Sequence, residues 1–170
     1  MAERIYLGLG SNSGDSRTIL RGAIGDLGSG LSELRVSSLW LSSPRYVLDQ
    51  PPYHNLVIEA LSDRKPEELL DYCSGIETRF GRDRSKERPK GPRTLDIDIL
   101  LIGHQVIDSP RLVVPHPGME ERKFVLLPLV ELARDLLNPR TGRSYLQSLA
   151  DLGPQGIYLV GLDDYDRFRF

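Results

Sequence analysis

The sequence has few of the residues that build disulfide frameworks and zinc sites. It contains one cysteine, Cys73, and three histidines among 170 residues. A single cysteine excludes an internal disulfide, and so few nitrogen and sulfur ligands argue against zinc. The composition predicts a buried, inert thiol in a reducing compartment, so we expect a cytoplasmic protein.

Long apolar runs are also missing. Stretches such as FVLLPLVELA fall far short of the roughly 20 residues that a membrane span needs, so no membrane partner is expected. The N-terminal MAERIYLGLGSN carries an acid and a base before it turns to glycine, unlike a signal peptide. The formal net charge of -2 gives no sign of a nucleic-acid partner. Without repeats or linkers, we expect a single domain over residues 1–170, and a monomer.

The common nucleotide-binding motifs are absent as well. There is no GxxxxGK[ST], and GLGSNSG has Ser13 where a dinucleotide fingerprint requires its third glycine. The DxDxT pattern of phosphatases is excluded because Ile99 and Leu100 follow Asp98. Any nucleotide must therefore be bound by another design.

The hydrophobic patterns predict alternating strands and helices. A strand over residues 4–10 is followed by a helix of about ten residues, capped by Asp15 or Ser16. One strand over residues 31–44 and another from residue 55 to 62 precede a helix over residues 65–81. A strand over residues 94–103, a short strand near residue 106 and a helix over residues 121–133 follow. This order predicts an α+β fold: a ferredoxin-like antiparallel sheet (split βαβ, βαββαβ core) with its helices on one face, plus extra C-terminal helices and short strands.

Two aspartates interrupt the apolar strand RTLDIDILLIG. Asp96 and Asp98 are two residues apart, so they share one face of the strand, opposite Leu95, Ile97, Ile99 and Leu101. Such a pair can hold a divalent cation, or two cations about 3.5–4 Å apart. Oxygen ligands suit Mg²⁺, which usually completes its shell with water and substrate phosphates. The alternative is an edge strand with two exposed acids.

A basic segment comes directly before the acid pair. Residues 79–93, RFGRDRSKERPKGPR, contain seven basic and two acidic residues. Arginine binds phosphate oxygens in bidentate fashion, which makes four members of this segment candidates: Arg82, Arg84, Arg88 and Arg93. A solvated surface loop is the alternative interpretation.

Other polar and aromatic residues cluster around proline-containing loops. Tyr53 and Asn55 share a strand face after the loop SSPRYVLDQPP, and they offer a ring for stacking and an amide that both donates and accepts. His116 lies between two prolines in VVPHPGMEERKF, close to Arg122 and Phe124. A lone histidine is often structural, so a phosphate contact and a packing role both stay open for His116.

Taken together, these segments resemble a known enzyme family. GLGSN, DQPPYHN, IETRFGR, GPRTLDIDILLIG and VPHPGMEERKFVLLPL, in this order, are similar to 6-hydroxymethyl-7,8-dihydropterin pyrophosphokinases of folate biosynthesis. The resemblance implies transfer of pyrophosphate from ATP to the hydroxymethyl group of the pterin, with release of AMP. It implies two Mg²⁺ ions on Asp96 and Asp98. The basic segment departs from the family in carrying an extra residue and no tryptophan before GPR.

The resemblance also assigns roles to individual residues. The catalytic group is Arg93, Asp96, Asp98, His116 and Arg122. The pterin-binding group is Ser43, Pro44, Tyr53, Asn55 and Phe124. The ATP-binding group is Glu77, Arg82, Arg84, Arg88, Arg93, Arg111, His116 and Arg122.

Two rival functions stay open. Another metal-dependent nucleotide enzyme, such as a glycosyltransferase with a DxD site, would not require Tyr53, Asn55 and Phe124. A ferredoxin-like regulatory module that binds a small ligand without chemistry would leave Asp96 and Asp98 unexplained.

Overall fold

A computed structural model describes residues 1–44, 49–83 and 91–160 of the chain. Its elements alternate strands and helices, as the hydrophobic patterns predict. In chain order they are β1 (Glu3–Ser11), α1 (Ser16–Gly30), β2 (Ser32–Val36), β3 (Trp40–Ser42), β4 (Tyr53–Ser62), α2 (Pro66–Arg79), β5 (Asp96–Ile102), β6 (Ile107–Asp108), β7 (Val113–Val114), η1 (Met119–Glu121), α3 (Lys123–Leu132), α4 (Tyr145–Asp151) and β8 (Ile157–Leu159).

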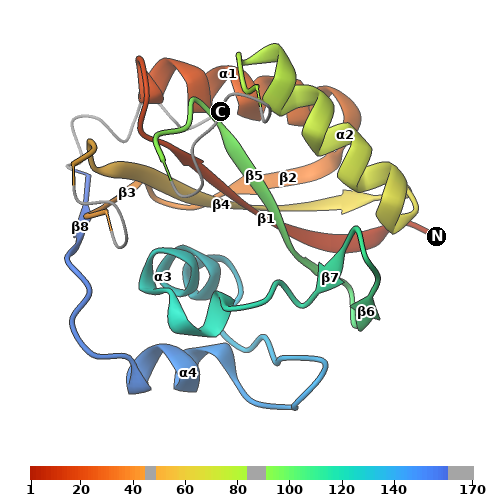
Figure 1. Ribbon diagram of the computed structural model, residues 1–170. Helices are drawn as coiled ribbons and strands as arrows, with labels where there is room; N and C mark the ends of the chain where they lie inside the picture. The colour runs from red at the N-terminus through yellow and green to blue at the C-terminus, as the bar shows by residue number, and fades with distance from the viewer. Residues whose placement is uncertain (45–48, 84–90, 161–170) are drawn as a thin grey trace.

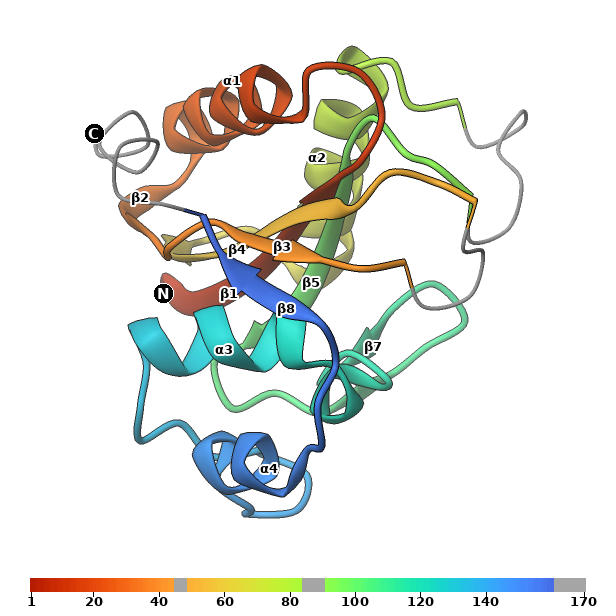
Figure 2. The ribbon, with the colours of Figure 1, turned by 90° about the vertical axis from the view of Figure 1, so that its left-hand side faces the viewer.

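The centre of the fold is an antiparallel sheet. Its strand order is β5-β1-β4-β3-β8, and β2 also pairs with β4 (Figures 1 and 2). β1 lies between β4 and β5 and is antiparallel to both. The sheet therefore brings the end of β5 that carries the two aspartates beside the end of β1 and the start of β4.

Helices cover both faces of this sheet, with the two helices that precede β5 on one face and the later helices on the other (Figure 1). α1 and α2 lie on one side, and α3, with α4 beyond it, lies on the other (Figure 1). The second face has an apolar core of its own, in which Tyr6, Val57 and Leu100 pack with Leu126 and Leu129 of α3. Because α3 is apolar around most of its circumference, it has to be buried between the sheet and α4.

The single strand expected over residues 31–44 is two strands, which is a correction to the prediction. β2 ends at Val36 and β3 begins at Trp40. Between them, the backbone N–H and the hydroxyl of Ser38 both donate to Glu131 of α3, at 2.9 and 2.8 Å. Both strands pair with β4, but the register shifts by one residue between them, from Val36 opposite Ile58 to Trp40 opposite Asn55.

A β-bulge changes the side-chain pattern of β5. Leu7 lies opposite Ile99 and Tyr6 opposite Leu101, so Leu100 is the extra residue. Leu101, which the alternation placed with Ile97 and Ile99, therefore packs on the α3 side instead. The Leu100 carbonyl accepts a hydrogen bond from the backbone N–H of His116 at 3.0 Å, which holds the His116 segment against the strand beside Asp98.

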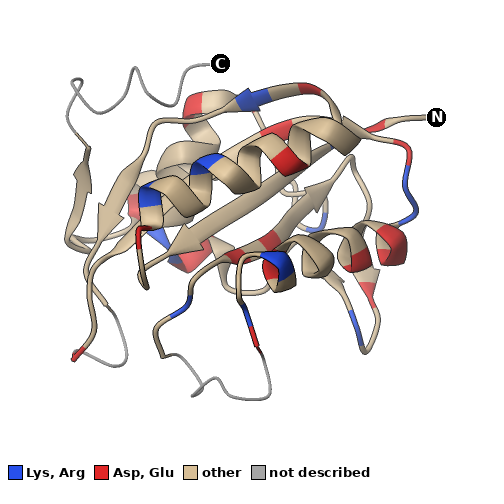
Figure 3. Ribbon diagram, turned by 90° about the horizontal axis from the view of Figure 1, so that it is seen from above, with Lys and Arg blue, Asp and Glu red and all other residues tan. Residues whose placement is uncertain are grey.

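The helices begin where the sequence predicts. The Asp15 side chain caps α1 through the N–H of Thr18 at 3.2 Å, and Pro66 occupies the first turn of α2. α1 is 15 residues long rather than about ten. Charged residues of both signs are interspersed along the ribbon (Figure 3). In the described part of the chain, no helix has the length and apolar character to cross a membrane.

Candidate active site

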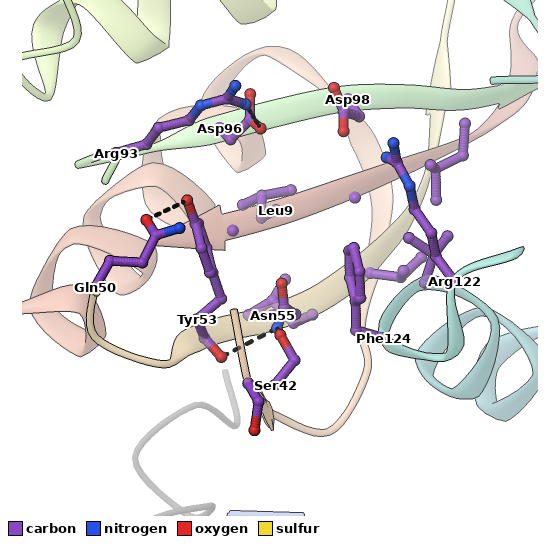
Figure 4. Close-up of a pocket in the computed structure, with 17 residues that line it drawn as sticks. Leu9, Ser42, Gln50, Tyr53, Asn55, Arg93, Asp96, Asp98, Arg122 and Phe124 are labelled. Atoms are coloured by element: carbon purple, nitrogen blue, oxygen red, sulfur yellow. Dashed lines mark hydrogen bonds and ion pairs between the residues drawn. The ribbon is translucent and has the colours of Figure 1, made fainter. Parts of the chain in front are cut away.

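A cavity of about 300 Å³ opens on the α3 side of the sheet, between β5, β1, β4 and the start of α3. It brings together most of the predicted site residues, although they are distant in the sequence (Figure 4). Those that line it are Ser43, Tyr53, Asn55, Arg93, Asp96, Asp98, Arg122 and Phe124.

One wall of the cavity is acidic. Asp96 accepts hydrogen bonds from Arg82 and Arg93, both at 2.5 Å, one on each carboxylate oxygen. Burial alone would raise the pKa of Asp96, but the charges and hydrogen bonds of Arg82 and Arg93 outweigh it and hold the pKa below its ordinary value. Asp96 is therefore a firmly ionised carboxylate.

Asp98 is in a different electrostatic position. Burial, and then the negative charge of Asp96, raise the pKa of Asp98 to about 7. Its nearest partner for an ion pair in the described chain is His116, whose Nε2 lies 3.7 Å from Oδ2 of Asp98. Burial, and then the positive charge of Arg122, lower the pKa of His116, so this histidine adds little positive charge at neutral pH. The positive charges of Arg122 and Arg93 oppose this rise only in part, so Asp98 lacks a full counter-charge, although 39% of its side chain is exposed.

Glu77 and Arg82 support the acidic wall from behind. The side chains of both are almost fully buried, and they form an ion pair with each other. Oε1 of Glu77 also accepts a hydrogen bond from the backbone N–H of Ile97 at 2.8 Å, which ties the end of α2 to β5 between the two aspartates. Glu77 therefore lies behind the wall and does not line the cavity.

The opposite side of the cavity carries two aromatic rings. Tyr53 and Phe124 lie on either side of Asn55 (Figure 4). Nδ2 of Asn55 donates to the Ser42 hydroxyl at 2.8 Å and to the Tyr53 carbonyl at 3.1 Å. The Tyr53 hydroxyl donates to the Gly91 carbonyl at 2.8 Å. This side presents stacking surfaces with a fixed amide between them.

Asn12 connects the loops around the cavity. It is 3% exposed, and its Oδ1 accepts from the N–H of Arg93 at 2.8 Å. Its Nδ2 donates to Oε1 of Gln50 at 3.1 Å and to the Pro51 carbonyl at 3.0 Å. Asn12 thereby fixes the backbone of Arg93 against the segment that precedes Tyr53. For Gln50, the available signal in the sequence was a polar residue directly before Pro51.

Some predicted residues lie elsewhere. Arg111 is exposed and pairs with Glu67 and Asp71 of α2, at 3.0 and 2.5 Å. Pro44 is half-buried and does not line the cavity. Arg84 and Arg88 lie outside the described residues.

The acidic wall has the donor chemistry of a magnesium site. Asp96 and Asp98 offer only oxygen, and a divalent cation would offset the burial and the charge of Asp96 that raise the pKa of Asp98. The described residues include no group of three or more histidine, cysteine or acidic side chains placed to hold a metal. A pair of carboxylates fits Mg²⁺, which takes one or two from the protein and its remaining ligands from phosphates and water.

The pKa of Asp98 predicts how stability depends on pH without metal. A folded-state pKa above the unfolded value means that the stabilisation from protonated Asp98 is full below about pH 4 and is lost as the pH rises through about 7. In EDTA, Asp98→Asn should therefore have a higher Tm than the parent protein at pH 8. The gap should close at pH 4, as measured by thermal unfolding followed by circular dichroism. An equal difference in Tm between variant and parent at both pH values would contradict a raised pKa for Asp98.

The fold and the cavity define the class: a mixed α/β protein whose antiparallel sheet carries an acidic wall opposite two aromatic rings. A family model for 7,8-dihydro-6-hydroxymethylpterin-pyrophosphokinase (HPPK) matches residues 6–134. The chain therefore belongs to the HPPK family, whose members are pyrophosphokinases. The family resemblance seen in the sequence is confirmed.

Individual relatives agree with this assignment. The chain is 43% identical over 160 residues to the 2-amino-4-hydroxy-6-hydroxymethyldihydropteridine pyrophosphokinase of Pseudomonas aeruginosa, with 92% of this chain and 96% of that one covered. It is 39% identical over 153 residues to the folic acid synthesis protein fol1 of Pneumocystis carinii, covering 88% of this chain but only 20% of the relative.

The fold is also similar to that of a solved structure. Wild-type HPPK-DHPS of Plasmodium falciparum with pteroate has a TM-score of 0.73, at 13% identity, covering 88% of this chain and 44% of that one. At this identity the likeness shows the fold alone. The chain thus spans nearly all of one bacterial relative and less than half of these longer fungal and parasite proteins.

Proposed function

We propose that the protein transfers a diphosphate group from ATP to the hydroxymethyl group of 6-hydroxymethyl-7,8-dihydropterin, a step of folate biosynthesis. One observation carries the proposal. A single cavity places the ionised Asp96 and the under-compensated Asp98 on one wall, and Tyr53, Asn55 and Phe124 on the other. Family membership favours this function over both rivals, and a regulatory module would have no use for the acidic wall.

The aromatic side is suited to the pterin. Tyr53 and Phe124 would stack on the two faces of the ring, and Asn55 would hydrogen-bond its polar edge, with Ser43 beside it. Pro44 follows Ser43 in the chain and would support this site from outside the cavity. The hydroxymethyl group would then point toward the aspartates. We propose these residues as the pterin site.

The acidic side is suited to magnesium-bound ATP. Asp96 and Asp98 would hold two Mg²⁺ ions, which when bound neutralise phosphate charge and make the attacking hydroxyl more acidic. Both oxygens of Asp96 already accept from arginines but keep further lone pairs, so metal ligation there would not require either hydrogen bond to break. We propose that Arg84, Arg88, His116 and Arg122 complete the ATP site. Glu77 would support this site from behind the acidic wall, and Arg111 would reach it only by leaving its pairs with Glu67 and Asp71.

The proposed chemistry is a single displacement at the β-phosphorus. The pterin oxygen forms a bond to this phosphorus while the bond to the oxygen that bridges the α- and β-phosphates breaks. AMP leaves with that bridging oxygen, and the hydroxyl proton is released to solvent. Arg93 and Arg122 face the cavity, and their positive charges would stabilise the phosphate oxygens as charge shifts toward AMP.

Several finer features belong to the same proposal. The strand order supports describing β1, α1, β2, β4, α2 and β5 as a ferredoxin-like split βαβ core. We propose that residues 1–170 form one domain. We also propose that the protein is monomeric and cytoplasmic and binds neither nucleic acid nor membrane.

The products provide the test of the function. Purified protein with ATP, MgCl₂ and 6-hydroxymethyl-7,8-dihydropterin should yield equal amounts of AMP and a pterin diphosphate by mass spectrometry. ADP with a pterin monophosphate, or no turnover, would reject the proposal. Omitting the pterin gives the control for ATP hydrolysis.

Phe124→Ala should mainly weaken pterin binding. Loss of the stacked ring is expected to raise the Kd for the pterin roughly 10- to 100-fold, since one base–aromatic stack is worth about 1–3 kcal/mol. The Kd for ATP should stay within about threefold in isothermal titration calorimetry. Unchanged pterin affinity would show that Phe124 does not form part of the ring site.

A further inference from the structure

Two glycines form part of the floor of the cavity. Gly8 and Gly10 lie on β1, in register with Asp98 and Asp96 on one side and with Val57 and Asn55 on the other. Both line the cavity, on the strand that runs between the aspartates and Asn55 (Figure 4). The floor between the acidic wall and the amide thus has no side chains at these two positions.

The backbone does not require glycine at residue 10. Gly10 lies inside a regular strand and has no positive φ, unlike Gly103 (φ 48°) or Gly118 (φ 73°). A Cβ built on Gly10 would meet only Oδ1 of Asn55 at 3.5 Å and Cδ1 of Tyr53 at 3.9 Å, which are ordinary van der Waals distances. Glycine in a strand interior weakens the strand, and it often marks a place where a ligand approaches the backbone closely.

The atoms that this Cβ would meet belong to the proposed pterin site. The Tyr53 carbonyl can only accept a hydrogen bond, so the amide nitrogen of Asn55 must be the atom that faces it. Oδ1 of Asn55 is therefore the atom turned toward Gly10. Among the described residues none donates a hydrogen bond to this Oδ1, so it is an acceptor available to a ligand N–H.

Building on the proposed function, we infer that Gly10 is a specificity-determining residue for the pterin. Its missing side chain lets the N–H-bearing edge of the ring reach the strand backbone and donate to Oδ1 of Asn55. A methyl group at residue 10 would cover this acceptor on the side from which the ring approaches. It would leave the bonds from Nδ2 of Asn55 to Ser42 and Tyr53 in place.

Gly10→Ala separates this role from a structural one. The full-length variant should fold with a Tm equal to or above that of the parent, because alanine fits the strand sterically and restricts the unfolded chain. Its Kd for 6-hydroxymethyl-7,8-dihydropterin should rise at least about tenfold, the cost of one buried hydrogen bond of about 1.4 kcal/mol. Its Kd for ATP with MgCl₂ should stay within about twofold.

Gly25→Ala is the matched control. Gly25 lies on the exposed side of α1, and a Cβ there meets nothing within 4 Å. This variant should raise the Tm and leave both dissociation constants unchanged.

A second measurement uses an Asn55→Ala background, in which the acceptor is gone. In that background, Gly10→Ala should lower pterin affinity by less than about threefold. Both substitutions remove the same hydrogen bond to Oδ1 of Asn55, so the second removal costs little more.

The outcomes distinguish this inference from the proposed function. If the parent protein neither binds nor converts the pterin, the proposed function fails. If the parent does both, the inference alone is overturned by any of four results. These are an unfolded Gly10→Ala protein, pterin affinity within twofold of the parent, an equal loss of ATP affinity, or full additivity with Asn55→Ala.

Discussion

Asp96→Ala and Asp98→Ala are each expected to abolish diphosphate transfer while the chain stays folded. Each variant removes half of the oxygen ligands that the protein offers to the cation site, so the triphosphate loses both its charge compensation and its alignment. We expect kcat to fall by about 10³-fold or more. The measurement is the rate of AMP formation at saturating ATP, pterin and Mg²⁺, with circular dichroism to establish folding.

Asp63→Ala is the control for this pair, since Asp63 is an exposed acid in the turn between β4 and α2. It should have the kcat of the parent protein. If either Asp96→Ala or Asp98→Ala kept more than about a tenth of the parent rate, the carboxylates could not be the anchor of the metal-bound triphosphate.

The second large effect is expected at two arginines. Arg93→Ala and Arg122→Ala should each lower kcat by about 10²–10³-fold, as expected for removal of one preorganised group that stabilises transition-state charge. Arg93→Ala has an added consequence, because Arg93 also lowers the pKa of Asp96. Single-turnover rates with both substrates bound would separate this loss from weaker binding.

Arg140→Ala provides the comparison for the arginines. Arg140 is exposed and pairs with Asp108 at 2.8 Å, and it does not line the cavity. Its removal should leave the rate unchanged, since exposed ion pairs contribute little. Single-turnover rates within about threefold of the parent in both Arg93→Ala and Arg122→Ala would show that these guanidinium groups do not act on the phosphates.

The fold could be predicted where local signals agreed with tertiary packing. The starts of α1 and α2 follow from the Asp15 cap and from Pro66 in the first turn of α2. The break after β2 could not be predicted, because the register shift against β4 and the bond from Ser38 to Glu131, 93 residues further along the chain, are both tertiary contacts. The bulge at Leu100 involves pairing with β1 and a hydrogen bond from the N–H of His116. Neither contact can be read from the alternation of side chains in β5.

The site could be predicted at residues whose burial costs free energy unless a ligand compensates their charge. Two aspartates in an apolar strand require an explanation, and the structure places both on the cavity wall. The supporting residues were harder to identify, because their roles come from contacts across the fold. Glu77 lies behind the wall, and the Asn12 side chain joins the end of β1 to the segments of Arg93 and Gln50.

A crystal structure with Mg²⁺, a non-hydrolysable ATP analogue and 6-hydroxymethyl-7,8-dihydropterin tests the central claim most directly. Metal density should lie about 2.0–2.1 Å from oxygens of both Asp96 and Asp98. The pterin should lie between Tyr53 and Phe124, with its hydroxymethyl oxygen facing the β-phosphate. Metal and nucleotide bound elsewhere, with the two carboxylates unligated, would contradict the account.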